Sequence, residues 1–288
     1  MPSPTYLVAG ATGTVGSRVV SSLAAREPAA TVLYGTRTPR GPDERAFDLA
    51  VPPQAAAALR EAEAAFLMLP PGLPRAAERF RAAFGEVADA DLPHAVFMSV
   101  QGAERRTFLP HARVEAVLRE RYRRAAPPRE PPRLTILRPA YFMQNLEGAF
   151  GRDIRLRGEL VAPLGGARLT WVDAGDVARA AAAILRTPRP HAGRDYAITG
   201  ADRAGFAAVA RLLAEALERP VAYRSPAPLT YFLRVCRAGL PAGAAAAQTA
   251  IHFAERFTAE APLTTDYTFV TGLWPVRLAD YVRGAFPG

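Results

Sequence analysis

The stretch YLVAGATGTVG, residues 6–16, decides the fold of this chain. Its first four residues form a short apolar run that is typical of a buried strand, and residues 17–26 continue it with helical periodicity. Three glycines lie between the predicted strand and the predicted helix. Gly10 allows a tight turn, Gly13 allows close approach of a ligand to the backbone, and Gly16 allows the helix to pack closely on the sheet.

This strand–turn–helix context predicts a dinucleotide-binding site. The first turn of the helix offers free N–H groups and the positive end of the helix dipole to a pyrophosphate. The residues expected to contact the phosphates are Gly10, Thr12, Gly13, Thr14, Val15 and Gly16. The alternative interpretation is a glycine-rich loop that binds no ligand.

Apolar runs and helical segments alternate through about residue 200. Further strands are expected at residues 31–35, 64–69, 95–100 and 134–137, with helices at 53–63, 74–90 and 111–124. Continuously apolar strands that alternate with helices indicate a parallel sheet covered on both faces. The predicted fold class is therefore α/β, a doubly wound parallel sheet of the Rossmann type with a smaller, mostly helical C-terminal substrate lobe.

The predicted boundaries follow the point where this alternation loosens. Residues 1–153 are expected to form the dinucleotide-binding core, and residues 168–200 are expected to add to its sheet. Residues 201–288, together with 154–167, are expected to form the smaller substrate-binding lobe. In an open α/β sheet the ligands bind at the carboxyl ends of the strands.

The end of the second predicted strand indicates which nucleotide is preferred. A site selective for NAD(H) places a carboxylate there, whereas this chain has Arg37, followed by Arg40. Arginine is suited to a 2′-phosphate, so the cofactor is predicted to be NADP(H). The alternative is that Arg37 is a solvated surface residue.

Two more segments are expected to contact the cofactor. Asp48 lies where such folds commonly bond the adenine edge, although it could equally cap the following helix. Leu69 and Pro70 end a predicted strand and would pass the middle of the cofactor.

Composition excludes several classes of chemistry. The chain of 288 residues carries 36 basic residues, all of them arginine, against 27 acidic ones, a formal net charge of +9. Without lysine there is no Schiff base, no P-loop lysine and no lysine acid. Cys236 is the only cysteine, so disulfides and cysteine metal clusters are excluded, and the four histidines show no metal-ligand spacing. No metal is predicted.

The basic balance could reflect nucleic-acid binding or the replacement of lysine by arginine. The arginine cluster of residues 119–133 contains one aromatic, Tyr122, and a solvated helix face explains it better than a nucleic-acid interface. The N-terminal residues lack the pattern of a secretory signal, and no uncharged apolar run is long enough to span a membrane. We therefore expect a cytoplasmic protein, a monomer or homodimer, that has a small-molecule substrate, contacts no membrane and binds no nucleic acid.

The glycine pattern, Arg37 and the stretch TILRPAYFMQN (residues 135–145) together resemble the NmrA-like, atypical short-chain dehydrogenase/reductase family. Further matches are HARVE (111–115), WVDAGDVA (171–178) and YAITG (196–200). The resemblance covers nearly the whole chain. It implies bound NADP(H), because the family includes NADPH-dependent quinone oxidoreductases, reductases of secondary metabolism, and regulators that bind the nucleotide without turning it over.

The chain departs from standard short-chain dehydrogenases in its catalytic residues. Those enzymes use Tyr-x-x-x-Lys, and a chain without lysine has no such dyad. By resemblance, His111 falls about where the lysine would be, with Glu115 one turn on along the same helix face. An imidazole can donate to a ribose hydroxyl or transfer a proton near pH 7. The alternative is a histidine that only caps the helix after Pro110.

The resemblance also assigns residues near the reacting end of the cofactor. Ser99 sits near the family's serine position, although its backbone could matter more than its hydroxyl. Tyr141 could donate to a developing oxyanion or serve only in packing. Phe142 is expected to be a packing wall, and Asn145 to orient a loop or contact substrate. The implied cofactor contacts in this part of the chain are Ser99, His111, Pro139 and Phe142.

The function favoured by these residues is an NADPH-dependent reductase of a small aromatic, quinone or conjugated carbonyl substrate. Aromatic residues that could line an apolar cleft, or simply pack in the core, are Tyr141, Phe142, Tyr231, Phe232, Phe253 and Phe257. Two alternatives stay open. One is a regulator that senses NADP(H) without catalysis, and the other is a biosynthetic enzyme that uses the fold for a non-redox step such as cyclisation.

Overall fold

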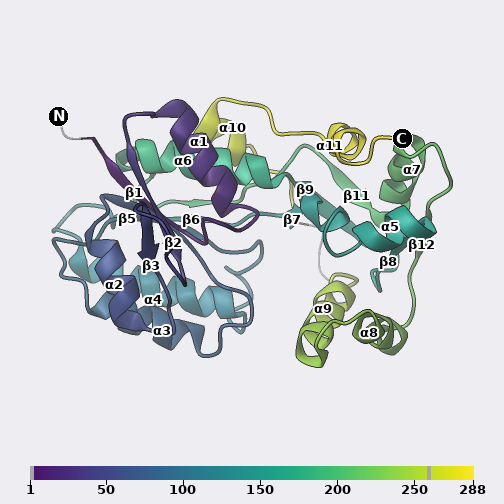
Figure 1. Cartoon of the computed structure of the whole chain (residues 1–288), viewed down its shortest axis with the longest axis horizontal. Coiled ribbons are helices and arrows are strands. Elements are labelled where there is room, and N and C mark those ends of the chain that lie inside the picture. The colour runs from purple at the N-terminus through teal and green to yellow at the C-terminus, as the bar shows by residue number, and fades with distance from the viewer. Residues whose placement is uncertain (1–2, 258–260) are drawn as a thin grey trace. The chain divides into compact units, whose positions relative to one another are not determined.

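The computed structural model describes residues 3–257 and 261–288 and divides the chain into two compact units (Figure 1). The first unit comprises Met1–Pro139, Ala174–Ile198 and Thr265–Leu273, and the second comprises Ala140–Asp173, Thr199–Thr264 and Trp274–Gly288.

The first unit is built on a seven-stranded sheet in which all neighbours are parallel. Its order is β10-β6-β5-β4-β1-β2-β3. The strands are β1 (Thr5–Ala9), β2 (Thr31–Thr36), β3 (Glu44–Ala46), β4 (Ala64–Met68), β5 (His94–Met98), β6 (Leu134–Leu137) and β10 (Asp195–Tyr196). From β1 the sheet extends to one side through β2 and β3 and to the other side through β4, β5 and β6, as in a doubly wound sheet. The prediction of a Rossmann-type α/β fold is confirmed.

Helices cover both faces of this sheet (Figure 1). One face carries α2 (Pro52–Arg60), α3 (Ala76–Gly85) and α4 (Pro110–Ala125), and the other carries α1 (Gly16–Arg26), α6 (Ala174–Arg186) and α10 (Asp266–Thr271). A short 3-10 helix, η2 (Arg189–His191), precedes β10. Because both faces are covered, the central strands are buried almost without alternation, which explains their continuous apolar sequences.

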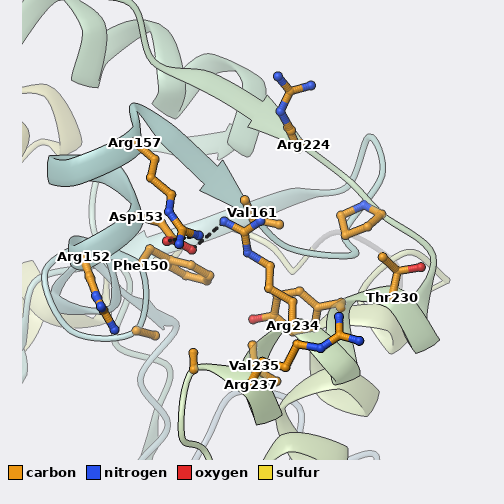
Figure 2. Close-up of a pocket in the computed structure, with 14 residues that line it drawn as sticks. Phe150, Arg152, Asp153, Arg157, Val161, Arg224, Thr230, Arg234, Val235 and Arg237 are labelled. Carbon is orange, nitrogen blue, oxygen red and sulfur yellow. Dashed lines mark hydrogen bonds and ion pairs between the residues drawn. The ribbon is translucent and has the colours of Figure 1, made fainter.

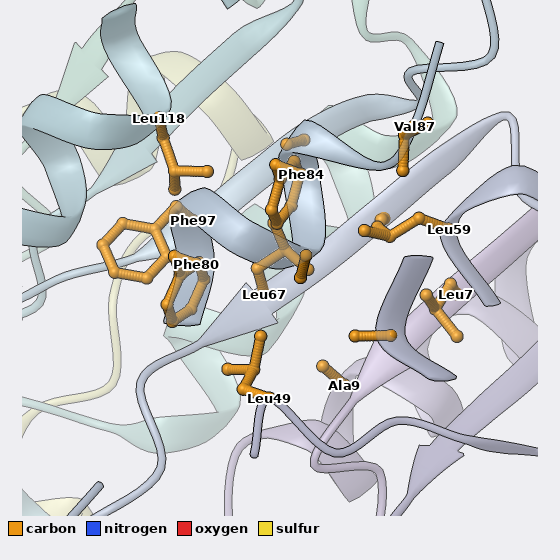
Figure 3. Close-up of a cluster of buried hydrophobic side chains, with 14 of the residues drawn as sticks. Leu7, Ala9, Leu49, Leu59, Leu67, Phe80, Phe84, Val87, Phe97 and Leu118 are labelled. Atoms are coloured by element: carbon orange, nitrogen blue, oxygen red, sulfur yellow. The ribbon is translucent and has the colours of Figure 1, made fainter. Parts of the chain in front are cut away.

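The core between the sheet and the face of α2, α3 and α4 is aliphatic and aromatic (Figure 3). Phe80 stacks with Phe84, with ring centroids 6.1 Å apart, and meets Phe97 edge-on at 5.8 Å. All three rings are fully buried. Such pairs add stability beyond their buried area, and they fix α3 against β5.

The arginine cluster of residues 119–133 is partly engaged inside the first unit. The buried Arg121 donates to the carbonyl oxygens of Phe84 and Val87, at 3.0 and 2.6 Å, and pairs with Asp89 at 2.5 Å. It thereby satisfies carbonyls at and beyond the end of α3. Arg119 pairs with Asp195 at 2.6 Å. These contacts give two of the cluster's charges a structural role.

The second unit contains two small sheets and several helices. A three-stranded sheet has the order β11-β9-β7, and β12 pairs with β8. The strands are β7 (Tyr141–Phe142), β8 (Glu159–Val161), β9 (Arg168–Val172), β11 (Arg203–Gly205) and β12 (Ala222–Arg224). The helices are η1 (Met143–Leu146), α5 (Gly151–Arg157), α7 (Phe206–Ala216), α8 (Pro228–Arg237), α9 (Ala242–Ala254) and α11 (Leu278–Ala285).

The unit boundaries differ from the predicted ones in three places. Residues 140–153 belong to the second unit rather than the core, and β9 adds to the second unit's sheet rather than to the large one. The reason is packing, because Trp171 of β9 is fully buried and its ring stacks on Phe206 at 5.6 Å in the second core. Residues 265–273 return to the first unit, where Tyr267 accepts a hydrogen bond from Arg179 at 3.1 Å.

Within the described ranges, no helix combines the length and the apolar character that a membrane span requires.

Candidate functional site

The carboxyl ends of the parallel strands bring most of the predicted cofactor residues of the first unit to one edge of the sheet. Residue 10 follows β1, residue 37 follows β2, residue 48 closely follows β3, and residues 69–70 follow β4. Residue 99 follows β5, and residue 139 lies two positions after β6. The loops after β1 and β4 flank the point where the order of the sheet reverses. Ligands of open α/β sheets bind at this place.

The loop after β1 presents unused donors. Gly10 adopts a positive φ of 67°, and its carbonyl accepts the N–H of Gly13 at 2.8 Å, which closes the turn. The N–H groups of Thr12, Thr14 and Val15 donate to no other residue that the structure describes. These donors lie immediately before α1, where the helix dipole is positive. They fit the oxygens of a pyrophosphate.

Gly16 is required by the packing of the loop. A Cβ at this position would lie 2.1 Å from the carbonyl oxygen of Gly10 and 2.7 Å from its carbonyl carbon. Both atoms are backbone atoms of the turn, so they have no side-chain freedom with which to move away. The same turn that presents these free N–H groups therefore permits only glycine at the start of α1.

The segment after β2 is open. Arg37 and Arg40 are both exposed, and the Arg37 side chain makes no hydrogen bond or ion pair with the described part of the chain. Asp48 uses its carboxylate to accept the N–H of Ala50 at 2.8 Å, in a turn before α2. This contact supports the structural alternative for Asp48, although the second carboxylate oxygen is left for a further donor.

A buried polar network occupies the ends of β5 and β6. The Ser99 hydroxyl donates to Glu115 at 2.5 Å, and Arg138 makes two hydrogen bonds to the same carboxylate, at 3.0 and 2.5 Å. Ser99 and Glu115 are buried, at 1% and 4% exposed. The one O–H of Ser99 is therefore used inside the protein and is not available to orient a substrate carbonyl.

His111 is the second residue of α4, one turn before Glu115. Its imidazole is half-buried and makes no hydrogen bond with the described residues, since Glu115 is engaged by Ser99 and Arg138 instead. Burial lowers the pKa of His111, and the Glu115 carboxylate opposes that shift. A neutral imidazole with free nitrogens at the start of α4 can accept or donate a hydrogen bond to a ligand.

The second unit contains the other predicted residues. The Tyr141 ring meets Trp171 edge-on at 5.1 Å, and its hydroxyl lies 3.0 Å from Nε2 of His252. Asn145 also hydrogen-bonds the Tyr141 side chain. Burial raises the pKa of the Tyr141 hydroxyl. Tyr141 is thus both packed and hydrogen-bonded. Phe142, the next residue of β7, lies opposite Val172 of the neighbouring strand β9.

His252 was not predicted. It lies in α9, 111 positions after its partner Tyr141, and it is 5% exposed. Burial lowers its pKa to about 4, so the ring is neutral at pH 7. Its Nδ1 is buried with no hydrogen-bond partner in the structure. No sequence motif links the two residues, and the apolar residues on either side of His252 are the signal that could have marked it as buried.

The remaining sequence expectations concern metals and aromatics. No group of histidine, cysteine and carboxylate side chains among the described residues could hold a metal ion. Phe253 and Phe257 meet edge-on at 5.2 Å, and Phe257 is 76% exposed. These two rings contact each other, whereas Tyr231 is buried and lines a pocket of the second unit.

Substitution of Gly16 provides a test of the phosphate loop. We expect Gly16→Ala to lower the free energy of unfolding by about 1–3 kcal/mol, because the new methyl group overpacks the turn. We expect it also to weaken NADPH binding by more than about tenfold, measured by fluorescence titration. Gly85→Ala is the matched control, since a Cβ there meets no atom within 4 Å. An unchanged NADPH affinity in Gly16→Ala would contradict the assignment.

Comparison with known proteins extends this description. No family model matches the chain. The chain is 30% identical over 223 residues to an NAD(P)H azoreductase of Xenophilus azovorans, covering 75% of each protein. A triphenylmethane reductase of Citrobacter, solved with NADP(H), superposes with a TM-score of 0.83 at 21% identity, over 98% of this chain and 99% of that one.

Two further solved structures share the fold. The quinone oxidoreductase QOR2 of Escherichia coli, solved with NADPH, has a TM-score of 0.82 at 20% identity, over 98% of this chain and 99% of that one. The negative transcriptional regulator NmrA, solved with NADP, has a TM-score of 0.74 at 17% identity, over 99% and 96%. Together with the glycine loop at the switch point of the sheet, these likenesses confirm the predicted family: the chain belongs to the NmrA-like, atypical short-chain dehydrogenase/reductase family.

Proposed function

We propose that this protein is an NADPH-dependent reductase of a small aromatic, quinone or conjugated carbonyl substrate. The observation that carries the proposal is the loop of residues 10–16, whose free N–H groups and obligatory Gly16 fit a pyrophosphate. The names of the relatives support it, because they describe reductases of azo compounds, triphenylmethane dyes and quinones. Bound NADPH would supply a hydride, and the protein would position and polarise the acceptor.

The first unit would hold the cofactor. The phosphates would bind the loop of residues 10–16, and the 2′-phosphate would pair with Arg37, whose side chain is exposed and has no partner in the described chain. Leu69 and Pro70 would contact the middle of the cofactor. His111, with both ring nitrogens free, is suited to a ribose hydroxyl in place of the missing lysine. Ser99 would act through its position in the buried network rather than through its O–H.

The hydrogen bonds around Tyr141 favour a role as a donor to the substrate. If Nε2 of His252 carries the ring proton, it donates to the Tyr141 oxygen, and the buried Nδ1 is an unpaired acceptor. The other tautomer would bury an unpaired N–H, and orphaned buried N–H groups are rarer than orphaned acceptors. The first tautomer leaves the Tyr141 O–H free to donate. Asn145 and Phe142 would then contact the same substrate.

The raised pKa of Tyr141 decides what this hydroxyl can do. It holds its proton, so it would polarise an acceptor by hydrogen bonding, and the final proton would come from water. Quinones and conjugated carbonyls tolerate this arrangement, because the negative charge that follows hydride addition is delocalised.

The direct test of function is to follow the loss of absorbance at the nicotinamide band. We expect the purified protein to bind NADPH and to oxidise it in the presence of 2-methyl-1,4-naphthoquinone. Tight NADPH binding without oxidation across a broad panel of quinones, enones and azo compounds would instead favour a nucleotide-sensing regulator. The absence of any NADPH binding would favour a non-redox enzyme.

Arg37→Asp tests the choice of cofactor. We expect the substitution to weaken NADPH binding by about 10- to 100-fold, because an arginine–phosphate contact is replaced by charge repulsion, while NADH binding changes little. Parallel fluorescence titrations with the two nucleotides measure the difference. Arg211→Asp, at an exposed arginine of α7 that has no partner in the described chain, is a control for the same change of charge. An equal loss for NADPH and NADH would remove Arg37 from the 2′-phosphate site.

Tyr141→Phe tests the proposed donor. We expect kcat to fall by about 10- to 100-fold with little change in NADPH affinity, because the substitution removes one preorganised donor and keeps the ring that packs on Trp171. Steady-state kinetics and a nucleotide titration give the two values. If kcat is unchanged, Tyr141 has only its packing role, and His111→Ala becomes the next variant to measure.

A further inference from the structure

The second unit contains a pocket that the cofactor site does not explain. Its volume is about 700 Å³, within the range of ligand sites. Figure 2 shows the charged side chains around it, which come from α5, β12 and α8. The lining residues that carry charge are Arg152, Asp153, Arg157, Arg224, Arg234 and Arg237. Five guanidinium groups thus share one pocket with a single lining carboxylate.

Three of these arginines are paired inside the protein. Arg234 bonds Asp153 at 2.8 Å and Glu159, which lies outside the lining, at 3.1 Å. Arg224 bonds Glu159 at 2.8 Å, and Arg157 pairs with Asp153 at 3.3 Å. These contacts raise the pKa of Arg234, first through Asp153, and lower the pKa of Glu159, first through Arg224. Two carboxylates therefore serve three arginines.

The other two arginines are unpaired. Arg152 of α5 and Arg237 of α8 make no hydrogen bond or ion pair with any residue in the described ranges, and both are exposed. The pocket consequently has an excess of positive charge that no neighbouring carboxylate balances. An exposed guanidinium group that has no carboxylate partner is available to an external anion. A guanidinium group pairs with carboxylate, sulfonate or phosphate oxygens in a bidentate geometry.

The remaining wall of the pocket is apolar. Phe150, Val161, Tyr231 and Val235 line it beside the arginines, and Val235 is the most exposed of the four. The rings of Phe150 and Tyr231 lie 5.7 and 6.0 Å from the ring of His252, the hydrogen-bond partner of Tyr141. The wall that contains Phe150 and Tyr231 therefore contacts the ring of His252, which in turn contacts the Tyr141 hydroxyl, the proposed donor. A ligand with a ring-sized apolar body and an oxyanion matches both walls at once.

We propose that this pocket binds an aromatic organic anion, with its oxyanion on Arg152 or Arg237, which lie on opposite sides of the pocket (Figure 2), and its rings against the apolar lining. As a substrate class for the proposed reductase, this means aromatic acceptors that carry a carboxylate or sulfonate group; that part of the inference rests on the proposed function. The binding site itself does not depend on turnover. Simple inorganic anions would use the arginines alone and gain nothing from the aromatic wall.

Binding is tested with a matched pair of probes, naphthalene-2-sulfonate and the neutral naphthalene-2-sulfonamide, by isothermal titration. We expect the wild-type protein to prefer the sulfonate by at least about tenfold, because a charge-assisted bond to Arg152 or Arg237 is available only to the anion. The double variant Arg152→Gln/Arg237→Gln should lose this preference without unfolding, since neither arginine is paired. Arg211→Gln on α7, exposed and also unpaired within the described chain, is the matched control and should keep it.

Equal affinity for the two probes in the wild-type protein, or an undiminished preference in the double variant, would overturn the proposal. Sodium sulfate tests whether the apolar wall contributes to recognition, because sulfate can bind the arginines only. If sulfate binds as tightly as naphthalene-2-sulfonate, the wall has no part in recognition and the proposal is also overturned. Thermal melting of each variant checks that the fold is retained.

Turnover is tested separately. We expect the KM for 1,4-naphthoquinone-2-sulfonate to rise about tenfold in the double variant, with the KM for 2-methyl-1,4-naphthoquinone unchanged. Sulfonate-selective binding without turnover of either quinone would support the pocket and count against the reductase function. Turnover of both quinones with no effect of the double variant on either KM would support the reductase and refute the pocket as its substrate site.

Discussion

The buried ion pair between Arg138 and Glu115 is the interaction on which the carboxyl edge of the first unit depends. The two side chains join the end of β6 to α4, and the Ser99 hydroxyl ties the end of β5 to the same carboxylate. Each partner has a further charged contact, because Arg138 also pairs with Asp195 at 3.0 Å and Arg119 lies 3.5 Å from Glu115. These contacts hold α4 against the ends of β5 and β6, and His111 lies on this helix one turn before Glu115.

The absence of lysine changes the chemistry available to this chain more than its net charge does. Arginine does not release its proton, so none of the 36 basic side chains can act as a general acid near neutral pH. The arginines differ instead in their surroundings, and these determine what each one can do. Arg121 and Arg138 are buried in hydrogen-bond networks, Arg37 is exposed beside the predicted cofactor site, and Arg152 and Arg237 face a pocket. A net charge of +9 consequently says little about partners until each arginine is placed.

The sequence predicted the parts of the molecule that local patterns determine. The glycine loop and the alternating apolar strands were sufficient for the fold class, because a parallel sheet buried on both faces leaves a continuous hydrophobic signal. The unit boundaries could not be read in this way, since β9 has the same apolar character as the strands of the large sheet and only its pairing with β7 and β11 distinguishes it. His252 and the arginine pocket depend on contacts across long sequence separations, for which no motif exists.

The environment of His252 limits the reactions that the second unit can support. Burial holds its pKa near 4, so at pH 7 the ring carries no extra proton and cannot deliver one to Tyr141. The raised pKa of Tyr141 has the same consequence, because the hydroxyl donates a hydrogen bond but does not ionise. An acceptor that needs a strong acid in the step of hydride addition would react slowly here. Acceptors that spread the new negative charge over a conjugated ring need no such acid, and an attached sulfonate or carboxylate would serve only for binding. The proposed donor role of Tyr141 and the proposed anion site of the neighbouring pocket therefore point to one substrate class, conjugated aromatic anions.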